Sequence, residues 1–117
     1  MRQISGFILT DISTSDEFVF ERRCAQCGRK HQSKAMRFSR SGVSPGSSGK
    51  TVIFDALRRR EKDAAEERAA AELMTHFNVC PICGRAVCDR CFLMCEDLDM
   101  CVNCAGVLDE IGEPVAT

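Results

Sequence analysis

The sequence predicts a small α+β fold that is held together by bound metal more than by a large hydrophobic core. Two observations lead to this prediction. The 117 residues include no Trp and no Tyr, and the nine cysteines include four Cys-x-x-Cys pairs. A chain of this length usually forms one compact domain, and a core with few large apolar side chains usually needs a staple. We therefore expect a single domain over residues 1–117.

The N-terminal part of the chain is expected to form short β-hairpins. Apolar residues at 4–9 and alternating apolar residues at 17–22 predict strands within residues 1–23. The first cysteine pair then opens a metal-binding knuckle at 24–38, which ends in a return strand at 34–38. Residues 39–50 are rich in Ser and Gly and predict a flexible loop.

One long helix is predicted from about 51 to 77, where the chain is rich in Ala, Glu, Arg and Leu and has no Gly or Pro. The apolar stripe expected to face the domain comprises Ile53, Leu57, Ala64, Ala71 and Met74. A cysteine-rich module follows at 78–112, with a short helix at 105–111 that is ended by Gly112 and Pro114. Residues 113–117 form a tail.

The cysteine pairs predict two structural zinc ions. A Cys-x-x-Cys turn directs two thiolates at one ion, and a closed tetrahedral zinc site takes two such pairs. Gly28 and Gly84 each follow a pair, where a left-handed conformation is often required. No apolar segment follows a basic start, so we expect a reducing, cytoplasmic location, in which disulfides are uncommon. Disulfides and iron–sulfur clusters are the alternatives.

The spacing of the pairs favours an alternating arrangement, known as a cross-brace. Only four residues separate Cys83 from Cys88, which is a short link for folding neighbouring pairs onto one ion. The expected ligands are Cys24, Cys27, Cys88 and Cys91 at site 1, and Cys80, Cys83, Cys101 and Cys104 at site 2. The alternative is sequential, with the first pair joined to the second and the third to the fourth.

Three further residues offer metal-binding atoms outside the four pairs. Cys95 is expected to be a small buried hydrophobe beside Phe92 and Leu93, and the alternative is that it replaces Cys91 as a ligand. His31 and His76 are expected to be ordinary surface or hydrogen-bonded histidines, since the cysteine pairs already supply eight ligands.

The run Cys-Pro-Ile-Cys-Gly-Arg-Ala-Val-Cys-Asp-Arg-Cys at 80–91 resembles the central run of FYVE-type zinc fingers, including their Rab-effector relatives. The resemblance implies a treble-clef zinc finger with eight cross-braced ligands. FYVE domains bind a phosphoinositide head group through a basic, His-rich run before the second ligand pair. Here residues 76–79 hold no basic residue besides His76, so specific phosphoinositide binding is not expected.

Charge is distributed unevenly along the chain, although the total is only −1. Residues 1–21 carry a net charge of −3, residues 22–62 a net charge of +10, and residues 63–117 a net charge of −8. The basic and acidic segments either face each other within the fold or leave a basic face for an anion. The candidate anion contacts are Arg22, Arg23, Lys50, Arg58, Arg59 and Arg60.

The run from Ser44 to Thr51 resembles a phosphate-binding loop, but no buried strand precedes it and no strand ending in Asp would supply a magnesium site. It is expected to be a mobile loop, and phosphate binding by residues 41–50 stays open.

Function is less clear from the sequence than architecture. Closed all-thiolate sites leave zinc no vacant position, so we do not expect an enzyme. The favoured function is a non-catalytic protein-interaction adaptor or regulatory subunit. The alternative is nucleic-acid binding through the basic segment 22–62, and a RING-like ubiquitin-ligase component is a remote third. No segment is apolar enough to predict a membrane span.

Overall fold

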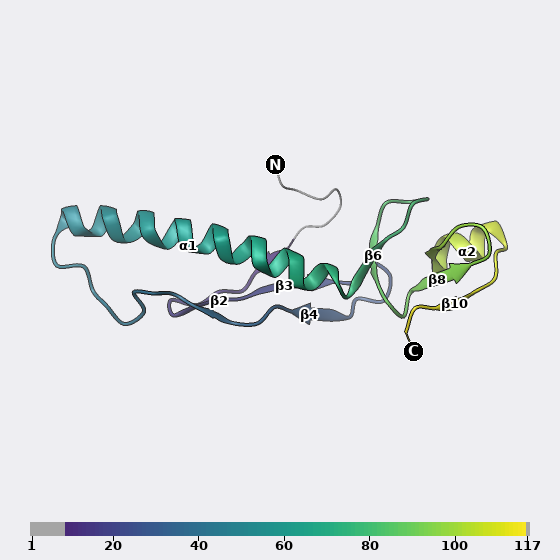
Figure 1. Cartoon of the computed structure of the whole chain (residues 1–117), viewed down its shortest axis with the longest axis horizontal. Helices are drawn as coiled ribbons and strands as arrows, with labels where there is room; N and C mark the ends of the chain where they lie inside the picture. The colour runs from purple at the N-terminus through teal and green to yellow at the C-terminus, as the bar shows by residue number, and fades with distance from the viewer. Residues whose placement is uncertain (1–8, 117) are drawn as a thin grey trace.

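The computed structural model describes residues 9–116, which form an elongated molecule with the helix α1 (Ser48–Met74) along much of its length (Figure 1). Its radius of gyration is 18.6 Å and its principal extents are 64 × 26 × 16 Å. A compact domain of this length would have a radius of gyration of about 13 Å. The loop before α1 and the C-terminal helix α2 (Val102–Leu108) lie at opposite ends of the molecule (Figure 1).

Two small antiparallel sheets lie along α1. In the first sheet, β3 (Phe20–Arg23) is flanked by β1 (Thr10–Asp11) and β4 (Lys30–Gln32). In the second, β2 (Glu17–Phe18) pairs with β5 (Met36–Arg37). The strand predicted at 17–22 is thus split between two sheets. The strand predicted at 4–9 falls almost wholly outside the described residues.

Helix α1 spans Ser48–Met74, three residues earlier at each end than predicted. It begins early because Ser47 caps it, with the hydroxyl accepting a hydrogen bond from the Lys50 N–H at 3.3 Å. It ends early because the chain turns at Thr75 and enters β6 (Phe77–Val79).

The predicted apolar stripe of α1 is confirmed only in part, because Leu57 and Met74 pack against the core clusters whereas Ala64 and Ala71 are exposed. The residues buried on the helix are Ala65, Ala69 and Leu73, whereas Ile53 is 62% exposed. The small alanines let the helix approach the rings of Phe18, Phe20 and Phe38, which form one of the two core clusters. Tertiary packing of these rings decides which face is buried. In the first turns of α1, Val52 and Ile53 stay in solvent, whereas Phe54 is half-buried against Phe38, with ring centroids 5.4 Å apart.

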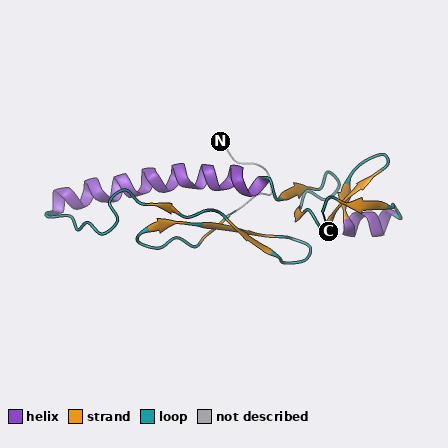
Figure 2. Cartoon of the chain, turned by 60° about the horizontal axis from the view of Figure 1, so that its bottom comes forward, coloured by secondary structure: helices purple, strands orange, loops and turns teal. Residues whose placement is uncertain are grey.

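The cysteine-rich module forms the other end of the molecule (Figure 2). Strand β6 pairs with β7 (Ala86–Cys88), and β8 (Phe92–Cys95) lies between β9 (Met100–Cys101) and β10 (Gly112–Pro114). Helix α2 spans Val102–Leu108, so the short helix begins and ends three residues earlier than predicted. Gly112 and Pro114 do more than end it, because both pair with β8.

The close approach of β10 to β8 requires a glycine at position 112. A Cβ atom there would lie 2.7 Å from both Cys95 Sγ and the Met94 carbonyl oxygen. Strand β10 could not approach β8 as closely with any side chain at this position. In the described part of the chain, the fold thus comprises two helices and four small antiparallel sheets.

Candidate metal centres

The structure gathers eight cysteines into two groups of four, and all sulfur atoms within a group lie within 4.8 Å of one another. Site 1 holds Cys24, Cys27, Cys88 and Cys91, and site 2 holds Cys80, Cys83, Cys101 and Cys104. The first pair thus lies beside the third, and the second beside the fourth. The sequential alternative does not match this arrangement. In each group three thiols are buried and one is exposed.

The sulfur–sulfur distances fit a tetrahedral metal site. Cys27 and Cys88 are 3.7 Å apart at site 1, and Cys83 and Cys101 are 3.8 Å apart at site 2. Four sulfurs bound tetrahedrally at about 2.3 Å from a zinc ion lie about 3.8 Å apart. Disulfide sulfurs lie about 2.05 Å apart, so these cysteines are free thiols placed for an ion. All-thiolate donors suit zinc well.

Two knuckles with the same local structure position half of the ligands. In the first, Gly28 has φ of 79° and its N–H donates to the Cys24 carbonyl at 2.9 Å. In the second, Gly84 has φ of 78° and its N–H donates to the Cys80 carbonyl at 2.8 Å. An L side chain rarely adopts such a φ, so each glycine is required by the turn.

Backbone N–H groups prepare one sulfur of site 1 to be a thiolate. The Sγ of Cys24 accepts hydrogen bonds from the N–H groups of Gln26, Cys27 and Cys88 at 3.3–3.4 Å. Burial raises the pKa of Cys24, but the N–H groups of Cys27, Cys88 and Gln26 outweigh it and lower the pKa to about 6. Metal binds thiolates, so this sulfur is ready to ligate.

Other thiols in the two groups have raised pKa values. Burial, followed by contact with the sulfurs of Cys27 and Cys88, raises the pKa of Cys91. Burial and the neighbouring thiols of Cys101 and Cys83 raise the pKa of Cys104 to about 12. Four sulfurs so close together cannot all ionise alone, because like charges repel. A dication at the centre would remove that repulsion, which supports a metal at each site.

Arg85 joins the two sites. Its guanidinium donates to the Ala25 carbonyl at 3.2 Å and to Gln26 Oε1 at 2.8 Å, both in the first knuckle, and contacts Cys101 Sγ of site 2 at 3.6 Å. The Arg85 N–H and then its side chain lower the pKa of Cys83 to about 6.

Arginines also lie beside site 1, where a cavity of about 440 Å³ is lined by Cys27, Arg29, Arg90 and Cys91. A zinc ion with four thiolates carries a net charge of −2, so nearby guanidinium groups are electrostatically suitable. Neither Arg29 nor Arg90 was predicted to lie beside a metal site. A signal was present for Arg29, because Cys-x-x-Cys-Gly-Arg occurs at both 24–29 and 80–85.

The remaining metal-binding side chains lie outside both groups. Cys95 is half-buried on β8 and packs at the edge of the core cluster that surrounds the sites, so it belongs to neither group. The rings of His31 and His76 stack on each other, with centroids 5.0 Å apart and 13° between their planes. Burial, and then the charge of His76, lowers the pKa of His31.

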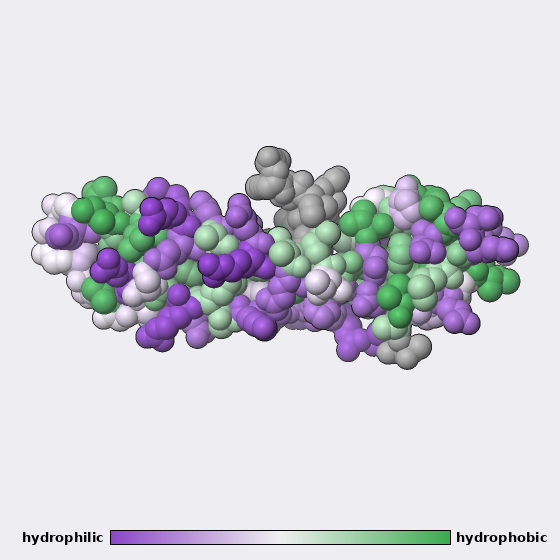
Figure 3. All heavy atoms as spheres, in the orientation of Figure 1, coloured by the Kyte–Doolittle hydropathy of each residue, from purple (hydrophilic) through white to green (hydrophobic). Residues whose placement is uncertain are grey.

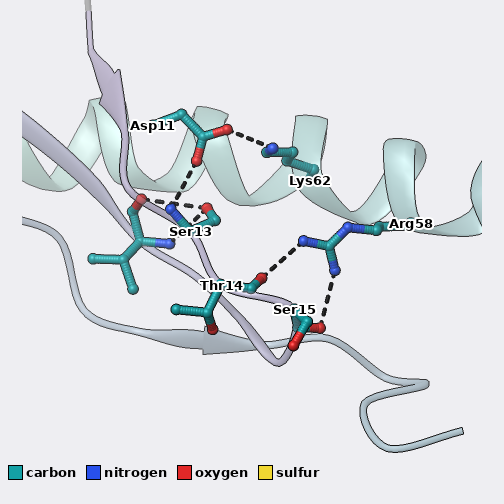
Figure 4. Close-up of polar contacts among 7 residues, drawn as sticks. Asp11, Ser13, Thr14, Ser15, Arg58 and Lys62 are labelled. Atoms are coloured by element: carbon teal, nitrogen blue, oxygen red, sulfur yellow. Dashed lines mark hydrogen bonds and ion pairs between the residues drawn. The ribbon is translucent and has the colours of Figure 1, made fainter.

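The six candidate anion contacts do not come together. Arg22 and Arg23 precede Cys24 on β3, whereas Lys50 lies in the first turn of α1. Lys50 is about 35 Å along the helix from Leu73, which packs in the same cluster as Cys24. Arg58 is engaged within the fold, as Figure 4 shows, while Arg59 and Arg60 are exposed.

Comparisons with family models, with curated proteins and with solved structures find no match to this chain. Of the helices described between residues 9 and 116, neither has the length and apolar character needed to cross a membrane. The geometry of the cysteine groups is therefore the main guide to function.

Proposed function

We propose that this chain is a zinc-stabilised interaction module, an adaptor or regulatory subunit, in which two structural Zn²⁺ ions form a cross-brace. The observation that carries this proposal is the pair of interleaved four-cysteine groups, whose spacing suits tetrahedral zinc. Eight thiolates fill both coordination spheres, so the metal would stabilise structure and leave no vacant position for a substrate. Residues 80–91 and the interleaving together support a FYVE-like, treble-clef architecture.

Several features support an interaction role. The described structure is elongated, and large apolar side chains are exposed near both of its ends, including Val52, Ile53, Val107 and Ile111. Exposed apolar groups next to charged residues are common at sites of protein association. Metal would hold the cysteine-rich end in shape, since its strands are only two to four residues long.

Metal analysis of the purified full chain tests the structural part of this proposal. We expect two zinc ions per chain, and a strong chelator should unfold the cysteine-rich module, because metal binding supplies folding free energy. One zinc ion or none would overturn the two-site architecture. Retained structure after complete metal removal would show that zinc does not stabilise the fold.

A further inference from the structure

Two stretches of the chain that lie toward opposite ends of the molecule carry opposite net charge. Residues 40–60, the loop before α1 and its first half, hold five basic residues and one acidic residue. Residues 92–116 hold six acidic residues and neither Lys nor Arg. Among residues 9–116, no ion pair joins these two stretches. Because they lie at opposite ends of a molecule 64 Å long, one chain cannot bring them together.

Both ends also expose apolar side chains, as the hydropathy colouring indicates (Figure 3). At one end, Val52 and Ile53 are 69% and 62% exposed. We call this end the basic tip and define it by Val43, Lys50, Val52 and Ile53. At the other end, Val107 and Ile111 are 76% and 89% exposed. We call this the acidic end and define it by Val107, Leu108, Asp109, Glu110 and Ile111.

The helix termini add to the charge of each end. An α-helix carries partial positive charge at its N-terminus and partial negative charge at its C-terminus. The first turn of α1 has no acidic residue, and Lys50 adds positive charge there. The last turn of α2 has no basic residue, and Asp109 and Glu110 follow it directly. Lys50 thus adds positive charge to the positive N-terminus of α1, and Asp109 and Glu110 add negative charge to the negative C-terminus of α2. Contact between the two ends would relieve the charge repulsion at both.

We propose that the basic tip of one copy docks on the acidic end of a second copy, so that chains associate head to tail. The contact joins two different surfaces, which makes it heterologous, and repetition extends an open chain of molecules. It pairs Val52 and Ile53 with Val107 and Ile111, and Lys50 with the acidic residues after α2. This names one partner for the interaction module proposed above and rests on that role.

Sedimentation velocity of the zinc-loaded full chain tests the contact. The few residues that define each end form a small contact, which should be weak, so the protein concentration should run from about 10 to about 500 µM. We expect the average sedimentation coefficient to rise with concentration, and salt at about 1 M to reduce that rise by screening the charges. A chain that stays monomeric over the whole range would overturn the proposal.

Two variants, each with one end disabled, separate this geometry from other modes of association. Val52→Ser/Ile53→Ser removes the tip, and Val107→Ser/Ile111→Ser removes the other end. Each variant alone should be monomeric. Their equimolar mixture should form a dimer and stop there, because each partner retains one working end. Failure of the mixture to dimerise, or wild-type association by either variant alone, would overturn the head-to-tail arrangement.

Matched controls keep folding separate from association. Ile12→Ser changes an exposed apolar residue outside both ends and should associate like the wild type. Lys50→Glu leaves the apolar residues in place and should weaken association by itself. Zinc content is measured for every variant. Two ions per chain without association refutes the self-contact alone, whereas loss of zinc in the wild type refutes the proposed scaffold.

Discussion

Replacing Arg58 by Ala should destabilise the N-terminal half of the fold. Its guanidinium donates to the Thr14 carbonyl at 2.8 Å and to the Ser15 carbonyl at 3.1 Å (Figure 4). It also lies over the rings of Phe18 and Phe38, 5.0 and 5.2 Å from their centroids. One side chain of α1 thereby holds both the turn before β2 and the aromatic cluster below it. The sequence had suggested this arginine as an anion contact.

The size of the effect follows from these contacts. Each hydrogen bond from a charged donor contributes about 1.5 kcal/mol, and a partly exposed cation–π contact about 0.5 kcal/mol. Water replaces part of both terms at a half-buried site, which leaves a loss of about 2 kcal/mol. With a urea dependence of about 1.5 kcal/mol/M, the unfolding midpoint should fall by about 1.3 M.

Urea unfolding at a fixed concentration of free zinc measures this loss, since any bound metal would also contribute to stability. Arg58→Lys should recover only part of it, because one ammonium group cannot reach two carbonyls as a planar guanidinium does. Arg59→Ala, at an exposed neighbouring position, should stay within about 0.5 kcal/mol of the wild type. Equal midpoints for Arg58→Ala and Arg59→Ala would refute the role assigned to Arg58.

Four further outcomes are expected. Cys88→Ser should lose zinc from site 1, whereas Cys95→Ser should keep both ions, as metal analysis of the two variants will show. Zinc affinity should fall as pH falls, because the thiols with raised pKa values must release protons to bind metal and the thiols with pKa values of about 6 become protonated in acid. A chromophoric zinc indicator measures this affinity, and an affinity that is the same at neutral and acidic pH would contradict the prediction. Gly112→Ala should cost about 2 kcal/mol in urea unfolding because its Cβ would meet Cys95 and backbone, while Gly106→Ala, with open space around it, should not be destabilising. Arg85→Ala should raise the population of singly loaded chains in native mass spectrometry during zinc titration, and an unchanged population would show that Arg85 does not couple the sites.

The features predicted correctly are those fixed by local chemistry. Composition predicted a long helix in the middle of the chain. The predicted helix ends were displaced by three residues, because the start depends on capping by Ser47, which the geometry of one turn decides. The proximity of the cysteine pairs followed from their spacing, since a link of four residues restricts which pairs can meet. Such signals need no knowledge of where distant segments lie.

The features predicted wrongly depend on contacts between distant segments. The buried face of α1 is set by rings from β2, β3 and Phe38, so periodicity within the helix could not identify Ala65 and Ala69. Gly112 and Pro114 were interpreted as terminators, but β8 recruits them as an edge strand. The positions of Thr14 and Ser15 relative to Arg58 likewise follow only from the folded chain.

Interleaving of the two cysteine groups would make metal binding at one dependent on metal binding at the other. Strand β7 ends in Cys88 of site 1 and follows directly after Arg85, whose backbone supports Cys83 of site 2. The Ala25 N–H of the first knuckle donates to the Ala86 carbonyl at 3.1 Å, so β7 is held from both sides. Metal at either group would therefore fix a strand that positions ligands of the other, and by linkage each ion would strengthen binding of its neighbour. A scaffold built in this way would lose its shape in one step as zinc is withdrawn, and any partner that recognises the cysteine-rich end would then be released with the metal.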